Sequence, residues 1–126
     1  MNRTIIASLI LVLSIILGIV SLVYIENVCA DMIETTDRTI DSILSENEAA
    51  LAENVRLSIE KLEKHRPILN VIMGQDDTIE LRGNLNQAIF YCNCKDYQAA
   101  ILHLQEYKTD LNRIISSNEP TPSTIF

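Results

Sequence analysis

Tryptophan is absent from this chain of 126 residues, and glycine, proline and cysteine each occur only three times. Phosphate-binding loops are rich in glycine, and the sequence has no glycine-rich segment. Only two histidines occur, and neither has a nucleophile or a carboxylate at a spacing typical of nucleophilic or acid–base catalysis. We therefore expect no enzymatic activity, no small-molecule substrate and no cofactor.

Positive charge is scarce as well. The sequence holds 10 Lys and Arg residues against 17 Asp and Glu residues, a net charge of −7. Arg3 is the one charged residue before Glu26, so residues 26–126 carry 9 bases and 17 acids, a net charge of −8. Nucleic acids are bound through basic surfaces, and this sequence has no basic stripe. We expect no nucleic-acid partner, and we attribute the acidity to solubility.

What the sequence does have is one long apolar run. Residues 4–25 contain no charged side chain, and 15 of these 22 positions are Ile, Leu or Val. As a helix the run is roughly 33 Å long, slightly more than the hydrocarbon core of a bilayer. Arg3 precedes the run, whereas residues 26–53 hold eight acids and one base. The positive-inside rule then predicts a cell-membrane protein with residues 1–3 in the cytoplasm and residues 26–126 outside.

Three other interpretations of the run remain open. Val28-Cys29-Ala30 resembles a signal-peptidase site, although the apolar core of a cleaved signal is usually shorter, about 7–15 residues. Cys29 lacks the small preceding residues of a lipoprotein signal. A buried helix of a soluble protein is rarely apolar on all sides over six turns. Cleavage after Ala30, which would release the rest of the chain, is the main alternative.

The remainder of the chain has a helical pattern. Apolar residues recur at gaps of three, four or seven, and the glycines outside the run are Gly74 and Gly83. The pattern predicts a long helix over residues 31–64 that ends near Arg66 because Pro67 follows. Further helices are expected over residues 78–92 and 97–116, with Asp76 or Asp77 as a helix cap. The predicted connections and tail are residues 67–73, Gly74 as a helix stop, residues 93–96, and an extended tail over residues 118–126.

The fold class predicted from this pattern is all-α: a transmembrane helix over residues 4–25 followed by a small antiparallel three-helix bundle over residues 26–117. The core should consist of the apolar residues that repeat on one face of each helix. These residues are Leu44, Leu51, Val55, Leu85, Ile89, Ile101, Leu104 and Leu111.

A metal site can be drawn from Cys92 and Cys94 with His65 or His103, because thiolate and imidazole are zinc ligands. The cysteines are closer in sequence than zinc ligands usually are, and a fourth ligand would have to be Cys29. We therefore expect no metal and interpret the cysteines as buried or unpaired thiols. His65, near the expected end of the first long helix, would be favoured there as a cation.

Inside the apolar run, small side chains fall on one helix face. They are Ala7, Ser14, Gly18 and Ser21, at offsets of seven, four and three. Small residues allow close approach of two helices in lipid, where no hydrophobic force drives association. This face is the predicted helix–helix contact within the membrane.

The order of elements also resembles a known family. The apolar anchor and the acidic helix are followed by Ile68-Leu69-Asn70, by Asp96-Tyr97 with Ala100, and by a terminal Ser123-Thr124-Ile125-Phe126. This arrangement resembles a family of uncharacterised, roughly 120-residue single-pass membrane proteins of Gram-positive spore-forming bacteria. Where that family often has a histidine, this chain has Val71-Ile72-Met73. The resemblance implies association with a polytopic membrane protein and assigns no site residues.

Taken together, the sequence predicts a non-enzymatic, membrane-anchored accessory protein that acts through protein–protein contacts. Its expected partners are the lipid bilayer and either a polytopic membrane protein or a second copy of the chain. The alternative is a secreted helical binding domain released by cleavage after Ala30.

Overall fold

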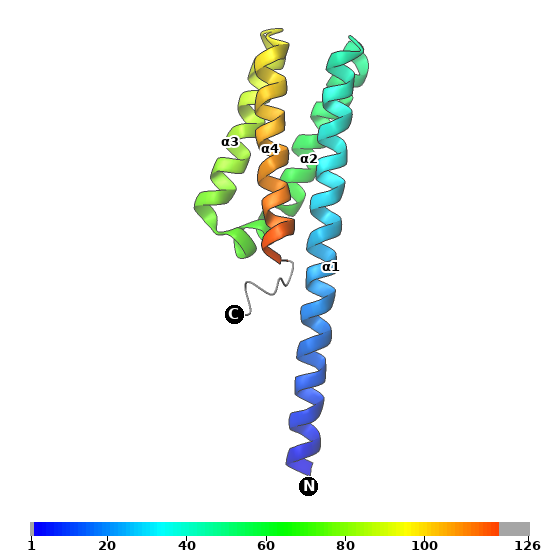
Figure 1. The fold of residues 1–126 in the computed structure, drawn as a ribbon, viewed down its shortest axis with the longest axis vertical. Helices are drawn as coiled ribbons and strands as arrows, with labels where there is room; N and C mark the ends of the chain where they lie inside the picture. The colour runs from blue at the N-terminus through cyan, green and yellow to red at the C-terminus, as the bar shows by residue number, and fades with distance from the viewer. Residues whose placement is uncertain (1, 119–126) are drawn as a thin grey trace.

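The computed structural model describes residues 2–118, which form four α-helices and no strand (Figure 1). The helices are α1 (Asn2–Leu44), α2 (Glu48–Met73), α3 (Gln75–Asn93) and α4 (Tyr97–Asn118). The all-α class is therefore confirmed for the described residues. Of the tail predicted over residues 118–126, residue 118 belongs to α4 and the rest lies outside the described residues.

The first helix is a single unbroken element. α1 contains 43 residues and is roughly 64 Å long at the rise of an α-helix. It includes the whole apolar run and continues into a segment whose buried residues extend from Val28 to Ile43. Figure 1 shows the first half of α1 standing clear of the other helices, while its second half lies beside them. Residues 26–30 therefore form no separate linker between the apolar run and the packed helices.

The helix predicted over residues 31–64 is wrong, because the chain turns back between α1 and α2. Glu46 adopts a left-handed conformation with φ 57°, and the Asn47 amide donates to Ser42 O at 3.1 Å. This bonding closes the end of α1 in the manner of a Schellman motif. Asn47 then caps α2, since its side chain accepts a hydrogen bond from Ala50 N at 3.1 Å. Leu44 and Leu51 are seven residues apart, so the apolar pattern continues across the turn and conceals it.

The predicted end at Arg66 is also wrong, because α2 runs through Pro67 to Met73. A proline inside a helix removes one backbone hydrogen bond and crowds the carbonyl four residues earlier. Here Leu62 and Leu69, on either side of Pro67, are 2% and 1% exposed. The burial of both leucines on one face favours continuation of the helix. α2 ends at Gly74, whose φ is 88° and whose amide donates to Asn70 O at 3.1 Å.

α3 begins three residues before the predicted start, so Asp76 and Asp77 lie inside its first turn rather than at the cap. The capping prediction is wrong, since Gly74 occupies the cap position and no side chain caps this end. The two carboxylates still favour the helix, because negative charge in the first turn interacts well with the helix dipole. The start of α4 at Tyr97 agrees with the prediction, and Asp96 caps it by accepting from Ala99 N at 3.4 Å.

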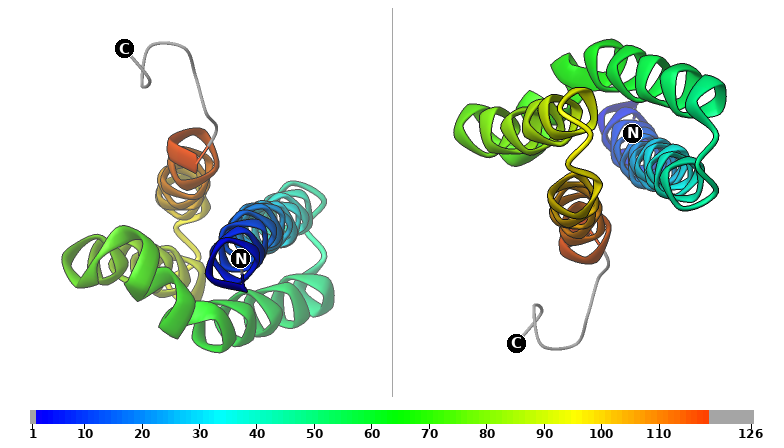
Figure 2. Two further views of the ribbon diagram at one scale, coloured as in Figure 1. Left: turned by 90° about the horizontal axis from the view of Figure 1, so that it is seen from below. Right: turned by 90° about the horizontal axis from the view of Figure 1, so that it is seen from above.

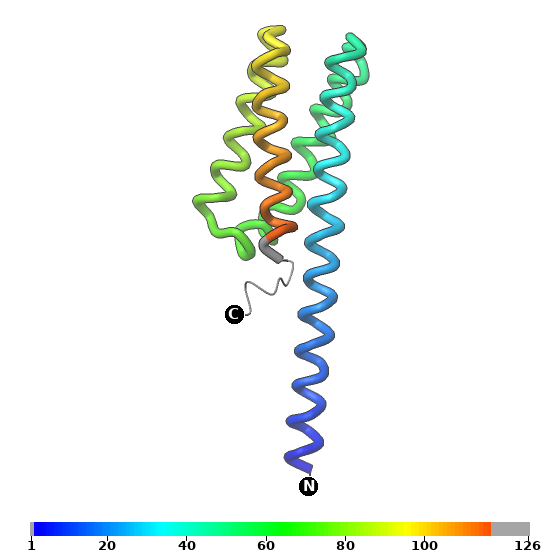
Figure 3. The backbone as a smooth tube through the Cα atoms, in the orientation of Figure 1, coloured from blue at the N-terminus to red at the C-terminus, as the bar shows by residue number. Residues whose placement is uncertain are grey.

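The four helices pack side by side, and the chain doubles back at each of its three turns (Figure 3). α1 packs on α2 and α4, and α3 packs on α4 and α2. Views along the long axis show α1 between α2 and α4 (Figure 2). The buried apolar core is formed by Val28, Cys29, Met32, Ile40, Ile43, Leu62, Leu69, Leu81, Leu85, Ala88, Ala100, Leu104, Tyr107, Leu111 and Ile114.

The core prediction is confirmed in part. Leu85, Leu104 and Leu111 are buried, and Leu51, Ile89 and Ile101 pack against the core while half-buried. Val55 is half-buried as well. The prediction that Leu44 belongs to the core is wrong. Its side chain is 68% exposed, because α1 ends at Leu44 and the side chain lies at the turn. The predicted core did not include Tyr107 or Met32, which are among the most deeply buried side chains. It did not include Cys29 either, although the interpretation of Cys29 as a buried or unpaired thiol is confirmed.

Candidate membrane and partner interface

The apolar half of α1 is left largely uncovered by the rest of the chain. Its large side chains before Ile25 range from 40% exposed at Leu22 to 65% exposed at Leu17, whereas Ile25 is half-buried against the core. Among the described residues, α1 is the one helix long and apolar enough to cross a membrane, and none of its most apolar stretch is buried. A core helix of a soluble protein would be mostly buried by its own chain. A helix with this surface needs lipid or a protein partner around it.

The four small residues of the predicted helix contact are all exposed: Ala7, Ser14, Gly18 and Ser21. At Gly18 an added methyl group would meet no other atom within 4 Å. Ser14 satisfies its hydroxyl within the helix by donating to Ile10 O at 2.8 Å. The face is therefore open and suited to an apolar environment. Its contact with another helix stays a prediction.

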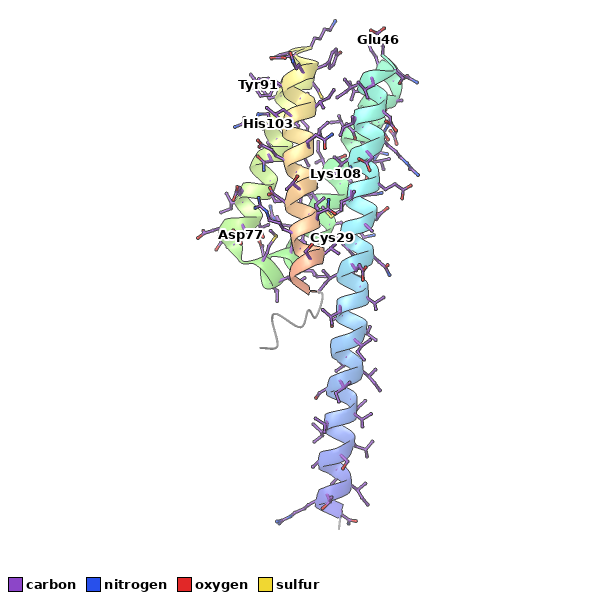
Figure 4. The ribbon with its side chains drawn as sticks, viewed as in Figure 1. Cys29, Glu46, Asp77, Tyr91, His103 and Lys108 are labelled. Atoms are coloured by element: carbon purple, nitrogen blue, oxygen red, sulfur yellow. The ribbon has the colours of Figure 1, made fainter. Side chains whose placement is uncertain are left out.

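The second half of α1 is fixed to α4. Cys29 and Tyr107 are 0% and 1% exposed, and burial raises the pKa of the Cys29 thiol to about 11. Burial also raises the pKa of Tyr107, and the nearby Cys29 raises it further. Lys108, the residue after Tyr107, also reaches α1, and its Nζ lies 2.8 Å from Asp37 Oδ1 (Figure 4 labels Lys108). An apolar contact and an ion pair thus join α4 to α1.

A polar seam joins α1 to α2, and sequence analysis did not find it. Lys61 Nζ donates to Thr35 Oγ1 at 2.7 Å and to Asp31 Oδ1 at 3.0 Å. Asn54 Nδ2 donates to Ser42 Oγ at 2.7 Å. Four buried hydroxyl residues fall on this side of α1, and their spacing is the signal that the sequence offered: the adjacent Thr35 and Thr36, then Thr39 and Ser42 at intervals of three. Hydrogen bonds of this kind set the register of two helices more sharply than apolar packing alone.

Two grooves open at opposite ends of the packed helices. The first has a volume of about 620 Å³ and lies where α2 ends beside the apolar run of α1. It is lined by Val20, Ser21, Tyr24, Ile25, Pro67, Ile68, Val71 and Ile72. The second has a volume of about 690 Å³ and lies between the α1–α2 turn and the α3–α4 turn. Its lining is mixed, with Leu44, Glu46, Lys95 and Tyr97 among the residues.

The cysteines and histidines considered as metal ligands are placed separately. Cys29 is buried on α1, Cys92 is half-buried near the end of α3, and Cys94 is exposed beyond it, all as free thiols. Burial raises the pKa of Cys92. Within residues 2–118, no three His, Cys, Asp or Glu side chains gather in a way that could hold a metal ion.

His103 is half-buried on α4 and stacks on Tyr91 of α3, with ring centroids 5.3 Å apart (Figure 4). Its Nδ1 is buried without a hydrogen bond and lies 3.7 Å from Glu106 Oε2. The stack joins α3 to α4, so the position of this histidine is explained by packing.

The prediction for His65 is wrong. α2 continues to Met73, so His65 lies two turns before the helix end and away from the last carbonyls. Partial burial lowers the pKa of His65, and the positive charge of Lys64 lowers it further. The neutral imidazole is therefore favoured at this position, rather than the cation.

Comparisons with protein-family models, with curated proteins and with solved structures find no match for this chain. The resemblance drawn from the sequence therefore stays a prediction.

Proposed function

We propose that this protein is a non-enzymatic, membrane-anchored accessory protein that acts through protein–protein contacts. In this proposal residues 4–25 span the cell membrane, residues 1–3 lie in the cytoplasm, and the acidic helices form an antiparallel bundle outside. The observation that carries the proposal is the continuity of α1, which is exposed and apolar in its first half and buried from Val28 onward. One rigid element thus belongs both to the anchor and to the packed helices.

This continuity has a mechanical consequence. A flexible linker would let the bundle move freely above the membrane, whereas an unbroken helix fixes its height and direction relative to the bilayer. The polar seam fixes α2 to α1, and the Lys108–Asp37 ion pair fixes α4 to α1. The surfaces of the bundle are then presented at defined distances from the membrane, as an accessory protein with a membrane partner requires.

The alternative, a secreted domain released after Ala30, is less well supported. Cleavage there would remove Val28 and Cys29, which are 8% and 0% exposed within the core. Loss of buried side chains leaves cavities, and a Leu-sized loss costs about 2–5 kcal/mol. Cleavage would also uncover Tyr107, whose ring packs in this region. A protein that needs residues on both sides of Ala30 for its core is better suited to keep its anchor.

The nature of the partner follows from the surface that is left open. The small face of α1 can take a second helix in the membrane, from a polytopic membrane protein or from another copy of the chain. The polytopic partner is also what the family resemblance implies. Nucleic acid is excluded from the proposal because residues 26–126 carry a net charge of −8.

Site-specific photocrosslinking in native membranes tests this proposal. A small photoreactive amino acid at Ser14 lies on the small face, and the same residue at Ile16 lies on the opposite side of α1. We expect a crosslinked protein from Ser14 and only lipid adducts from Ile16. Equal yields of protein adducts at both positions, or none at either, would argue against a specific contact.

The orientation is tested separately with a protease-sensitive tag placed after Phe126. We expect the tag to be cut by protease added to intact cells, because the acidic part of the chain is proposed to lie outside. A tag cut only after the membrane is opened would reverse the proposed topology.

A further inference from the structure

The membrane-side groove brings together two segments that are far apart in the sequence. Val20, Ser21, Tyr24 and Ile25 of α1 line one side, and the last two turns of α2 line the other. In Figure 1 the α2–α3 turn lies at the level where α1 leaves the packed helices. The end of α2 therefore lies beside the apolar run, at its final turns.

The level of these turns in a bilayer follows from the length of the run. A helix of 22 residues is roughly 33 Å long, against about 30 Å for the hydrocarbon core. If the run spans the membrane, its last turns lie at the outer boundary of the hydrocarbon. Tyr24 fits this level, because tyrosine is enriched where lipid tails meet headgroups. The end of α2, at the same height, then lies at this boundary too.

The surface of this end of α2 suits such a position. Val71 is 86% exposed, more than any other large apolar side chain among the described residues, and Ile68 is 37% exposed. No charged residue occurs from Pro67 to Gln75. Charged residues begin immediately outside this segment, with Arg66 before it and Asp76 after it. An uncharged, apolar tip between two charged positions can enter the lipid surface but cannot pass deeply into it.

We propose that the last two turns of α2, residues 67–73, form a second membrane contact, in which Val71 and Ile68 insert among the upper parts of the lipid acyl chains. This inference rests on the proposed anchoring through α1. The bundle would then contact the bilayer at two places, through α1 and through the end of α2. Two contacts restrict the rotation of the bundle relative to the membrane.

The chemistry of the contact is apolar rather than ionic. Asp76, Asp77 and Glu80 lie in the first turns of α3, next to this tip (Figure 4 labels Asp77). Their charges oppose attraction to anionic headgroups, so anionic lipid is not needed. The contact should form on bilayers of zwitterionic phosphatidylcholine and should persist in high salt, because screening does not weaken apolar burial.

The absence of tryptophan allows a direct test, since one introduced tryptophan is a unique fluorescent probe. Three full-length variants are reconstituted in phosphatidylcholine vesicles: Val71→Trp at the proposed contact, Leu11→Trp inside the apolar run, and Leu44→Trp at the far turn. Leu44 is 68% exposed, so this substitution disturbs little. Quenching by lipids brominated on their acyl chains is compared with quenching by iodide in the water.

The expected result is that Val71→Trp resembles Leu11→Trp: it loses intensity in brominated vesicles, is protected from iodide and emits at shorter wavelength than Leu44→Trp. If Leu11→Trp is quenched by brominated lipid but Val71→Trp behaves like Leu44→Trp, the second contact is wrong while the anchor stands. If Val71→Trp is protected from both quenchers, a second copy of the chain covers it, and the lipid contact is again wrong. If Leu11→Trp is not quenched by brominated lipid, the anchoring itself is overturned.

Discussion

Cys29 of α1 and Tyr107, in the middle of α4, lie together in the core. Their exposed fractions are 0% and 1%. The α1 residue is only four positions beyond the apolar run of residues 4–25. The helix that contains the apolar run is therefore also part of the packed core, and changes at this contact should affect the whole packed region.

Alkaline pH should destabilise the packed helices through this contact. Burial raises the pKa of Cys29 from 9.0 to about 11 and raises that of Tyr107 as well. Above pH 9 the unfolded thiol releases its proton while the folded one keeps it, so the free energy of unfolding falls as pH rises toward the folded pKa. Denaturant titrations between pH 8 and pH 11 should show this loss. Cys29→Ala should reduce the slope, and an unchanged slope would mean that this thiol does not contribute.

Core packing in α4 can be tested with two neighbouring leucines. Leu104 is 2% exposed and Leu102 is 59% exposed. Leu104→Ala should lower the free energy of unfolding by about 2–5 kcal/mol, because it leaves a cavity. Leu102→Ala serves as the matched control and should cost less than about 0.5 kcal/mol. Equal effects of the two substitutions, measured by denaturant unfolding of the full chain in detergent, would show that α4 is rotated.

The α3–α4 turn offers a stabilising substitution. Lys95 has φ 61°, and its neighbour Asp96 donates its amide to Tyr91 O at 2.9 Å, which completes the end of α3. A left-handed conformation is costly for lysine and free of steric cost for glycine. Lys95→Gly should therefore raise the free energy of unfolding by about 0.5–1 kcal/mol. Lys64→Gly, inside α2, should lower it by about 1 kcal/mol. A loss of stability in both variants would contradict the left-handed turn.

The small face of α1 can be tested by filling it. Gly18→Ile keeps the run apolar and long enough to insert, but it adds a branched side chain where a second helix is proposed to approach. We expect unchanged membrane targeting and loss of the copurifying partner or of self-association. Leu9→Ile, on the opposite side of α1, is the control and should retain the partner. Equal partner recovery from both variants would show that the small residues are incidental.

Sequence patterns revealed much of the fold where local signals agreed with packing. The apolar run, the start of α4 at Tyr97 and the stop at Gly74 were all predictable from composition, periodicity and turn residues. The α1–α2 turn was not, because Leu44 and Leu51 keep the apolar pattern in phase across it. Pro67 led to the opposite error, a predicted helix end that does not exist. The burial of Leu62 and Leu69 keeps α2 helical through Pro67.

The candidate interface was predictable only where it lies within one helix. The small face follows from spacing along the apolar run, and its residues are indeed exposed. The groove beside Tyr24 combines residues more than 40 positions apart, and it exists because α2 runs through Pro67 back to the end of the apolar run. The polar seam between α1 and α2 likewise depends on the turn at Glu46, which brings Lys61 back to Thr35.

The proposed function requires that the apolar part of α1 stays attached to the packed helices. Mass spectrometry of the mature protein purified from membranes tests this most directly, because it locates the N-terminus. We expect residues 4–30 to be retained in the membrane-bound protein. A mature protein that begins at Asp31 would contradict it, since the anchor would be lost together with Val28 and Cys29 of the core.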